Sequence, residues 1–214
     1  VALIERGKVA SADTARTTAH LTYVTDHRLH RLVDKFGKDA TRAFWEGGAA
    51  AIDQIWNITR ETGVDCEFRW VPGYFHARVG SDSSKERPSL EQDAQIAREL
   101  GFDAEFLELV PQANHCGIRF AQQAKFHPRK YLAALVRATP GEGSHVFENA
   151  IFEDFDESTQ TATLAGGRKI RCGYVVIATH NPVMGSRGMV SATLFQTKLS
   201  LYTSYVLGAR LAPG

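Results

Sequence analysis

Glu5 stands where a carboxylate can bind a nucleotide. It directly follows the apolar residues 1–4, and Gly7 begins a turn two residues later. Where a strand of a dinucleotide-binding βαβ unit ends in an acidic residue, its oxygens accept hydrogen bonds from ribose hydroxyls. Such units also bind the pyrophosphate with a G-x-G-x-x-G loop, and that pattern is absent from the 214 residues. Glu5 therefore indicates a nucleotide site whose phosphate-binding loop this chain does not carry.

Three histidines lie close together in the sequence but do not predict a metal site. His27 and His30 are three residues apart in a predicted helix, and His20 precedes them. No cysteine or carboxylate completes a ligand set of the kind that zinc requires. We therefore interpret His27 and His30 as solvated helix residues and expect no metal.

Two sets of side chains in the strand-rich part of the chain could contact a substrate. The cations that could pair with a carboxylate are Arg119, Lys125, Lys198 and Arg210. The tyrosines that could line a pocket are Tyr74, Tyr202 and Tyr205. Each set has an ordinary alternative, because most such cations are surface charges and a tyrosine on a sheet is usually packed.

The composition is that of a globular enzyme domain. Hydrophobic residues make up 43% of the 214 positions, which suffices for one large domain or two small ones. A net charge of +1 gives no reason to expect nucleic acid or an anionic membrane as the partner, and no apolar stretch approaches the ~20 residues that span a bilayer. The widely spaced Cys66, Cys116 and Cys172 favour buried free thiols in a reducing, cytoplasmic protein.

Two helices are predicted in the first third of the chain. Asp26 is placed to cap a short helix that Gly37 ends, and a longer helix should run from about residue 39 to residue 62 before Gly63. The expected buried stripe of the longer helix consists of Ala40, Phe44, Gly47, Ala51, Ile55 and Ile58.

Alternating apolar residues predict strands in the middle of the chain. Pro72 and Gly73 favour a turn between the first two strands. We interpret residues 80–88 as polar and mobile, and Ser89 with Gln92 as a capping box that starts the next helix. The expected strands are residues 66–70, 74–77, 104–110 and 116–121.

Pro128 opens a further helix, and strands dominate the rest of the chain. The expected strands are residues 145–148, 151–155, 161–164, 169–172, 174–178 and 203–211. Residues 174–178 are apolar throughout, which is typical of a strand buried on both faces of a parallel sheet. We expect this strand to end beside the strand that precedes Glu5, so that Ala178 lies near Glu5.

The order of the elements predicts an α/β (α+β) fold with two interleaved parts. Residues 1–64 and 127–190 have the helices, meander and buried strand of a nucleotide-binding domain. Residues 65–126 and 191–214 are richer in alternating strands, which suits an antiparallel sheet covered on one face. Such a sheet placed over a nucleotide would form a substrate pocket. The strands expected in it are residues 65–79, 104–121 and 203–211.

Six segments carry a resemblance to a known family. The first is SADTARTTAHLT at residues 11–22, after the strand that precedes Glu5. The others are GVDC at 63–66, VPGY at 71–74, IRFAQQAKFHPRKYL at 118–132, VVIATHNP at 175–182 and TSYVLGAR at 203–210. Together they resemble FAD-dependent oxidoreductases of the D-amino-acid oxidase and glycine oxidase family. They are most similar to the branch whose full-length members often carry a C-terminal Rieske iron–sulfur domain.

The resemblance implies a partial Rossmann-like FAD-binding domain interleaved with an antiparallel-sheet substrate domain, both incomplete in an internal fragment. In the complete enzyme, FAD would oxidise a C–N bond of a small-molecule amine or amino acid. No Cys-x-His or Cys-x-x-His pair occurs, so this chain cannot hold a Rieske cluster. We expect the chain alone to lack bound FAD and oxidase activity, and to be mobile or to self-associate through an exposed sheet edge near residues 1–25.

The resemblance also implies which residues contact the cofactor. Glu5 would bind the adenosine ribose, and the backbone of Val146 would recognise adenine. A turn offers the cation Arg16 and small donors to the pyrophosphate or a flavin carbonyl, and His20 would pass near the flavin ring. His180 replaces the glycine of the family's Ala-Thr-Gly. The predicted cofactor contacts are Glu5, Arg16, Thr17, Thr18, Ala19, His20, Val146, Ala178 and Thr179, and the predicted substrate contacts are Arg119 and Tyr205.

Two other classes of protein share some of these features. A dehydrogenase with a nicotinamide cofactor also ends its second strand in an acidic residue, although residues 16–22 and the interleaved strand-rich part argue against it. A non-catalytic scaffold or binding protein could keep the fold without the cofactor, since the glycine loop is missing, if residue 1 is the true start.

Overall fold

The computed structural model describes residues 1–78, 80, 82–111 and 113–179. Contacts between residues divide the chain into two compact units. One contains Val1–Arg16 and the chain from Thr139 onward, and the other is Thr17–Ala138. We expected boundaries near residues 64 and 126 instead. By their packing, residues 17–64 therefore belong to the same compact unit as the strand-rich residues 65–126. The division of the chain into a cofactor-binding domain and a substrate domain stays a prediction.

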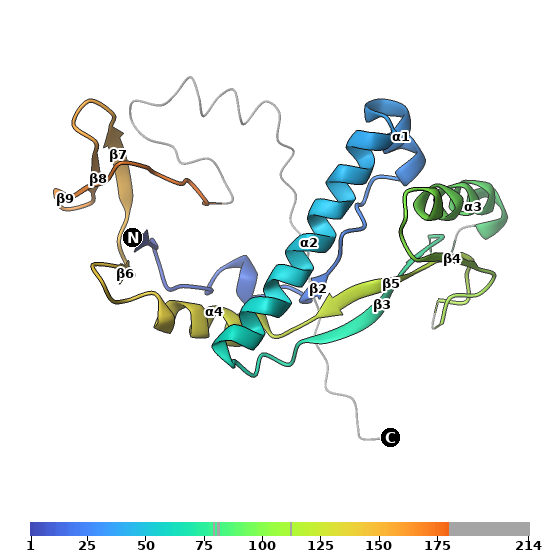
Figure 1. Cartoon of the computed structure of the whole chain (residues 1–214), viewed down its shortest axis with the longest axis horizontal. Coiled ribbons are helices and arrows are strands. Elements are labelled where there is room, and N and C mark those ends of the chain that lie inside the picture. Colours follow the sequence, from blue (N-terminus) through green and yellow to red (C-terminus); the bar gives the residue numbers. More distant parts are fainter. Residues whose placement is uncertain (79, 81, 112, 180–214) are drawn as a thin grey trace. The chain divides into compact units, whose positions relative to one another are not determined.

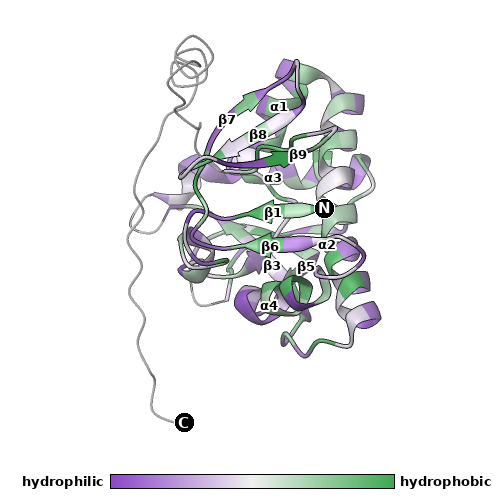
Figure 2. Cartoon of the chain, turned by 90° about the vertical axis from the view of Figure 1, so that its left-hand side faces the viewer, coloured by the Kyte–Doolittle hydropathy of each residue, from purple (hydrophilic) through white to green (hydrophobic). Residues whose placement is uncertain are grey.

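The described part of the first unit contains two small sheets (Figure 1). In one, β1 (Ala2–Ile4) pairs in parallel with β6 (His145–Phe147), and the mostly hydrophobic residues of β1 are visible in Figure 2. The other sheet is an antiparallel meander of β7 (Phe152–Asp156), β8 (Thr161–Leu164) and β9 (Arg168–Arg171). The strands β6, β7, β8 and β9 lie where the alternation of apolar residues predicted them.

The second unit is built on a four-stranded antiparallel sheet centred on β5 (Gly117–Lys125). Along one edge of β5 runs β3 (Arg69–His76). The opposite ends of β5 pair with β2 (His20–Leu21) and β4 (Ala104–Leu107). The prediction that residues 65–79 and 104–121 form one sheet, distinct from the sheet of β1, is confirmed. The third segment predicted for this sheet, residues 203–211, lies outside the described residues.

Four α-helices occur in the described part of the second unit, namely α1 (Leu29–Phe36), α2 (Lys38–Thr62), α3 (Ser83–Glu99) and α4 (Pro128–Ala138). As predicted, Gly37 ends α1, and Gly63 ends α2 in the left-handed conformation with φ 64°. The predicted cap Asp26 is wrong, because Arg28 precedes α1 and makes no side-chain cap. No helix in the described residues is both long enough and apolar enough to cross a membrane.

Helix α3 begins seven residues earlier than the sequence predicted, because its N-cap is Asp82 and not Ser89. Asp82 caps it by accepting the Ser84 N–H at 3.1 Å. Pro88 lies within the helix, and the Ser89 hydroxyl donates to the Glu86 carbonyl at 2.8 Å instead of acting as a cap. The interpretation of residues 80–88 as mobile is therefore wrong, since most of them form the first turns of α3.

Pro72 and Gly73 do not turn the chain. They lie inside β3, where the pairing with β5 shifts between Val71 and Gly73, so the two expected strands are one strand with a bulge. A Cβ at Gly73 would lie 2.7 Å from Cγ of Gln123. Glycine is needed here because the buried Gln123 side chain lies against the backbone.

An aromatic core joins the helices to the sheet of the second unit. Trp45 of α2 is 1% exposed, and its ring centroid lies 5.5 Å from that of Tyr23 and 5.7 Å from that of Phe120. Burial raises the pKa of Tyr23. The buried residues of α2 are Thr41, Trp45, Ile52 and Thr59.

The buried stripe expected on α2 is therefore wrong, and Phe44 is 63% exposed. The helix buries the large side chain of Trp45, and the adjacent Phe44 therefore faces away from the core. The prediction of buried free thiols is confirmed for Cys66 and Cys116, whereas Cys172 is only half-buried.

The apolar residues 174–178 do not form the predicted strand. Tyr174 is 94% exposed and Val176 is 88% exposed, and neither belongs to a described sheet. A fully apolar strand is stable only with hydrogen-bonded neighbours and covered faces, and no described strand pairs with it. The expected sheet that would bring Ala178 beside Glu5 is therefore not formed.

Gly117 provides a sharp test of packing in the second unit. A Cβ there would lie 2.6 Å from both the Phe75 carbonyl oxygen and a methyl group of Val110. Gly117→Ala should therefore lower the free energy of unfolding by about 1–3 kcal/mol, the usual cost of overpacking. At Gly47, which is exposed in α2 and has no atom within 4 Å of an added methyl group, alanine should raise it by about 0.5–1 kcal/mol. Urea unfolding that gives both variants the same sign would contradict this packing.

Candidate functional site

The carboxylate of Glu5 is fixed at the end of β1 with one oxygen available. Its backbone N–H donates to the Phe147 carbonyl at 2.9 Å, and its Oε1 accepts the Gly7 N–H at 2.7 Å. Gly7 is the one donor to this carboxylate within the described chain. Oε2 can therefore accept a hydrogen bond from a ribose hydroxyl, which is the geometry predicted for a nucleotide-binding strand end.

Val146 lies in β6, opposite Leu3 of β1. The flanking His145 and Phe147 bond to β1, through His145 N–H to the Val1 carbonyl at 2.8 Å and through the Phe147 carbonyl to Glu5. In a parallel ladder this alternation directs the N–H and C=O of Val146 to the other edge of β6, where the described residues place no strand. These backbone groups are thus available to an adenine ring, and Val146 lies in the same sheet as the strand that precedes Glu5.

Glu148 holds the turn that follows Glu5, a role that the sequence did not reveal. Its carboxylate binds Lys8 Nζ at 2.8 Å and the Val9 N–H at 2.9 Å. These two contacts, the Lys8 side chain first, lower the pKa of Glu148, so the carboxylate is charged at neutral pH. The turn is also bonded through Asn149 N–H to the Gly7 carbonyl. Glu148 therefore fixes the turn from the end of β6.

The predicted contacts at residues 16–20 are divided between the two units. Arg16 is exposed in the first unit, after the short 3-10 helix Asp13–Ala15. In the second unit, the Thr17 hydroxyl accepts the Ala19 N–H at 3.1 Å, and Ala19 has a left-handed φ of 61°. Thr18 is exposed, and His20 pairs with Lys125 at the end of the sheet.

Two further predicted contacts, Ala178 and Thr179, are exposed and belong to no strand. Their expected position beside Glu5 depended on the strand over residues 174–178, which is not formed. Tyr205, like Tyr202, Lys198 and Arg210, lies outside the described residues.

Arg119 lies on a sheet face of the second unit that the helices leave uncovered. It pairs directly with Tyr74 of β3 and Glu105 of β4, and directly opposite residues share a face. Its neighbours Ile118 and Phe120 point to the other face and are buried in the core. The side chain of Arg119 is 35% exposed, and its guanidinium lies 3.8 Å from the Glu105 carboxylate. This long contact leaves Arg119 able to pair with another anion.

His76 shares this surface, although the sequence did not single it out. It follows Tyr74 by two residues in β3 and pairs with Gly117 of β5, so its side chain lies on the same face. Val110 packs against Gly117 and bounds the surface at that end. We call the surface formed by Tyr74, His76, Arg119 and Glu105 the Arg119 face. The register of three strands defines it, and a register is not visible in the spacing of any one segment.

The histidines considered as metal ligands have other roles. His30 is not solvated as predicted, because its backbone N–H and its Nδ1 lie 2.8 and 2.7 Å from Oδ1 of the buried Asp93. His27 is exposed. No cluster of three or more metal-ligating side chains occurs in the part of the chain that the structure describes.

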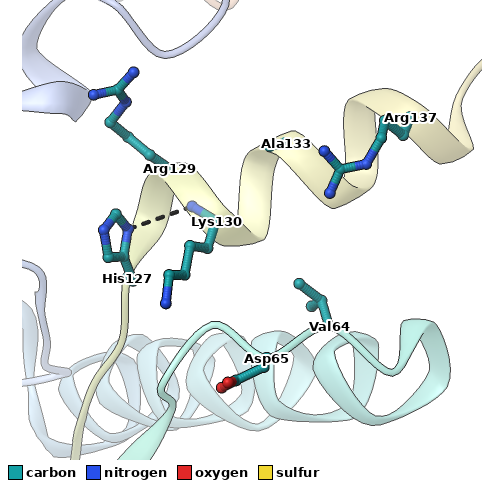
Figure 3. Close-up of a pocket in the computed structure, with 7 residues that line it drawn as sticks. All are labelled: Val64, Asp65, His127, Arg129, Lys130, Ala133 and Arg137. Carbon is teal, nitrogen blue, oxygen red and sulfur yellow. Dashed lines mark hydrogen bonds between the residues drawn. The ribbon is translucent and has the colours of Figure 1, made fainter.

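A cavity of about 570 Å³ lies between the segment that follows α2 and helix α4 (Figure 3). Its lining residues are Val64, Asp65, His127, Arg129, Lys130, Ala133 and Arg137. His127 directly precedes α4, and its Nδ1 accepts the Lys130 N–H at 3.4 Å. Lys130 is paired with Glu67. None of the predicted cofactor or substrate contacts lines this cavity.

Comparison with known proteins identifies the family. The profile of the family described as FAD dependent oxidoreductase matches residues 1–206. The chain therefore belongs to this family, as the resemblance of its segments implied. It is 25% identical over 213 residues to a Bacillus subtilis (strain 168) protein, YhfW, described as a Rieske 2Fe-2S iron-sulfur protein. The match covers 98% of this chain and 40% of that relative.

Several solved structures share the fold. Glycine oxidase from Geobacillus kaustophilus matches 83% of this chain and 48% of its own at 18% identity, with a TM-score of 0.58. L-Proline dehydrogenase from P. horikoshii matches 84% and 46% at 16% identity, with a TM-score of 0.60. L-Amino acid deaminase from Proteus myxofaciens matches 80% and 38% at 13% identity, with a TM-score of 0.56. The chain thus spans less than half the length of these proteins.

Proposed function

We propose that the protein containing this chain uses FAD to oxidise a C–N bond of an amino acid. The family implies FAD as the cofactor. Glycine oxidase, L-proline dehydrogenase and L-amino acid deaminase, which share the fold, are named for amino acids. In this chain, the observation that carries the substrate class is Arg119, an accessible cation beside Tyr74 on an uncovered sheet face. Its guanidinium would bind the substrate carboxylate in bidentate geometry.

The residues of the first unit fit the adenosine half of FAD. Glu5 has an available carboxylate oxygen for the ribose, and the outward backbone groups of Val146 suit adenine. When bound, FAD accepts a hydride equivalent from the carbon that bears the nitrogen. On the family resemblance, we assign the pyrophosphate and flavin contacts to Arg16, Thr17, Thr18, Ala19 and His20.

Glu5→Arg in the whole protein should weaken FAD binding by about one to two decades. The ribose would lose a charge-assisted acceptor worth roughly 1.5–3 kcal/mol and meet a cation instead. Flavin retained after dialysis measures the effect. As a control, Arg6→Glu changes the charge of an exposed neighbour, and FAD binding should stay near that of the wild type. Equal flavin retention in Glu5→Arg and wild type would rule out this role for Glu5.

The proposed activity is tested by anaerobic reduction of the flavin in the whole protein. Amino acids should bleach the oxidised flavin, whereas the amines that correspond to them without the carboxylate should do so much more slowly. Faster reduction by a nicotinamide cofactor than by any amino acid would favour a dehydrogenase. A protein without flavin, or with flavin that no amine or amino acid reduces, would favour a non-catalytic role and overturn the proposal.

A further inference from the structure

The tautomer of His76 is set by its own strand end. Its Nδ1 lies 2.7 Å from the Ala77 carbonyl oxygen. Because a carbonyl oxygen only accepts hydrogen bonds, Nδ1 must carry the hydrogen, and Nε2 of the neutral ring then has a free lone pair. Within the described chain, no group bonds to Nε2. His76 is thus oriented as a proton acceptor.

The separation of His76 and Arg119 on the Arg119 face suits the size of an α-amino acid. Its Cα is one diagonal step from that of Arg119, a spacing of about 7–8 Å in antiparallel sheets, and both side chains extend from the same face. Gly117, directly opposite His76, has no side chain of its own, and a methyl group of Val110 packs over it. The amine and carboxylate of an α-amino acid are attached to one carbon. A substrate carboxylate on Arg119 would therefore place the substrate nitrogen within reach of His76.

We propose that His76 accepts the proton of the substrate ammonium group, an inference that rests on the proposed function. One N–H bond of the ammonium breaks, its electron pair remains on the substrate nitrogen, and the proton binds Nε2 of His76. The products are a neutral amine and an imidazolium, and no electron leaves the substrate in this step. The neutral amine is the reactive form, because its lone pair stabilises the cationic carbon that forms as hydride departs.

The charged groups around His76 come from three strands. Tyr74 lies on β3 itself, Arg119 on β5 and Glu105 on β4, while the loop before β5 contributes the apolar Val110. These are the polar groups that share the Arg119 face with His76.

The pH dependence of kcat/KM for flavin reduction in the whole protein tests this role. The wild type should lose activity as pH falls through the range in which histidine becomes charged, between pH 5 and 8. His76→Asn can keep a donor for the Ala77 carbonyl, and His76→Gln places an amide near Nε2, but neither accepts a proton. Both should lower kcat/KM by about 100-fold or more and lose this acid limb, with flavin content unchanged. His27→Gln, at an exposed histidine of the same unit, is the matched control.

Three outcomes would overturn the inference. Full activity of either His76 variant with an unchanged acid limb would do so and leave the proposed function intact. An equal loss of activity at every pH in both variants, with the limb kept, would reveal a structural role. A wild-type protein whose flavin no amino acid reduces at any pH would overturn both proposals.

Recovery of His76→Ala activity by added imidazole, without recovery of an Arg119→Gln variant, would support the role of His76 as proton acceptor.

Discussion

Replacing Asp93 with alanine is expected to lower the free energy of unfolding by about 3–5 kcal/mol. Asp93 is 4% exposed in α3. Its Oδ2 accepts Arg28 Nε at 2.6 Å, and its Oδ1 accepts the His30 N–H at 2.8 Å. Arg28 also donates to Ser89 and lies over the Phe75 ring, 5.2 Å from its centroid. Removing the carboxylate would leave a largely buried guanidinium and a helix N–H without their acceptor.

The matched control is Glu99→Ala in the same helix. Glu99 also forms an ion pair, with Lys38 Nζ 2.7 Å from its Oε2, but both side chains are exposed. Because solvent and salt screen such pairs, its loss should barely move the urea midpoint. Unfolding followed by the fluorescence of the buried Trp45 compares the variants. Equal losses at Asp93 and Glu99 would show that the Asp93 network does not hold α1 to α3.

Local backbone chemistry made much of the fold predictable from the sequence. Gly37 and Gly63 end α1 and α2 as expected, because glycine alone adopts positive φ without strain. The strands of the meander also lie where their alternation placed them. By contrast, Pro72 and Gly73 form a bulge, since pairing with β5 over the length of β3 outweighs their preference for a turn. Long-range pairing of this kind leaves no mark in the local sequence.

The candidate site was predictable to the same extent. The position of Glu5 at the end of β1 was predicted from the apolar residues before it, and β6 supplies the parallel partner that holds Val146 in the same sheet. The contacts of both residues with a cofactor stay predictions. Glu148 could not be identified, because its contact with Lys8 joins residues 140 positions apart. The strand at residues 174–178 was expected from its apolar composition alone. Composition cannot supply the neighbouring strands that such a segment needs, so the predicted position of Ala178 was wrong.

Arg119→Gln in the whole protein is expected to lower kcat/KM for an amino acid by about 100-fold. Loss of one partner of a desolvated charge pair costs about 2–5 kcal/mol, and each 1.4 kcal/mol is tenfold. The corresponding amine without a carboxylate gains nothing from Arg119, so its kcat/KM should hardly change. Kinetics of flavin reduction with the two substrates measure this difference. A loss shared equally by both substrates would indicate general damage to the sheet and exclude Arg119 as the carboxylate partner.

A substitution of Glu105 provides a second test of Arg119, because Glu105 is the carboxylate that lies beside it. Its carboxylate lies 3.8 Å from the guanidinium, with 60% of its side chain exposed, so a substrate must compete with it for the cation. Glu105→Gln should therefore keep the activity with amino acids and lower their KM, opposite in direction to Arg119→Gln. When Glu105→Gln is combined with Arg119→Gln, KM for amino acids should no longer fall, because the cation that Glu105 competes for is absent. A Glu105→Gln variant that loses amino-acid binding as Arg119→Gln does would mean that the pair acts as a structural unit.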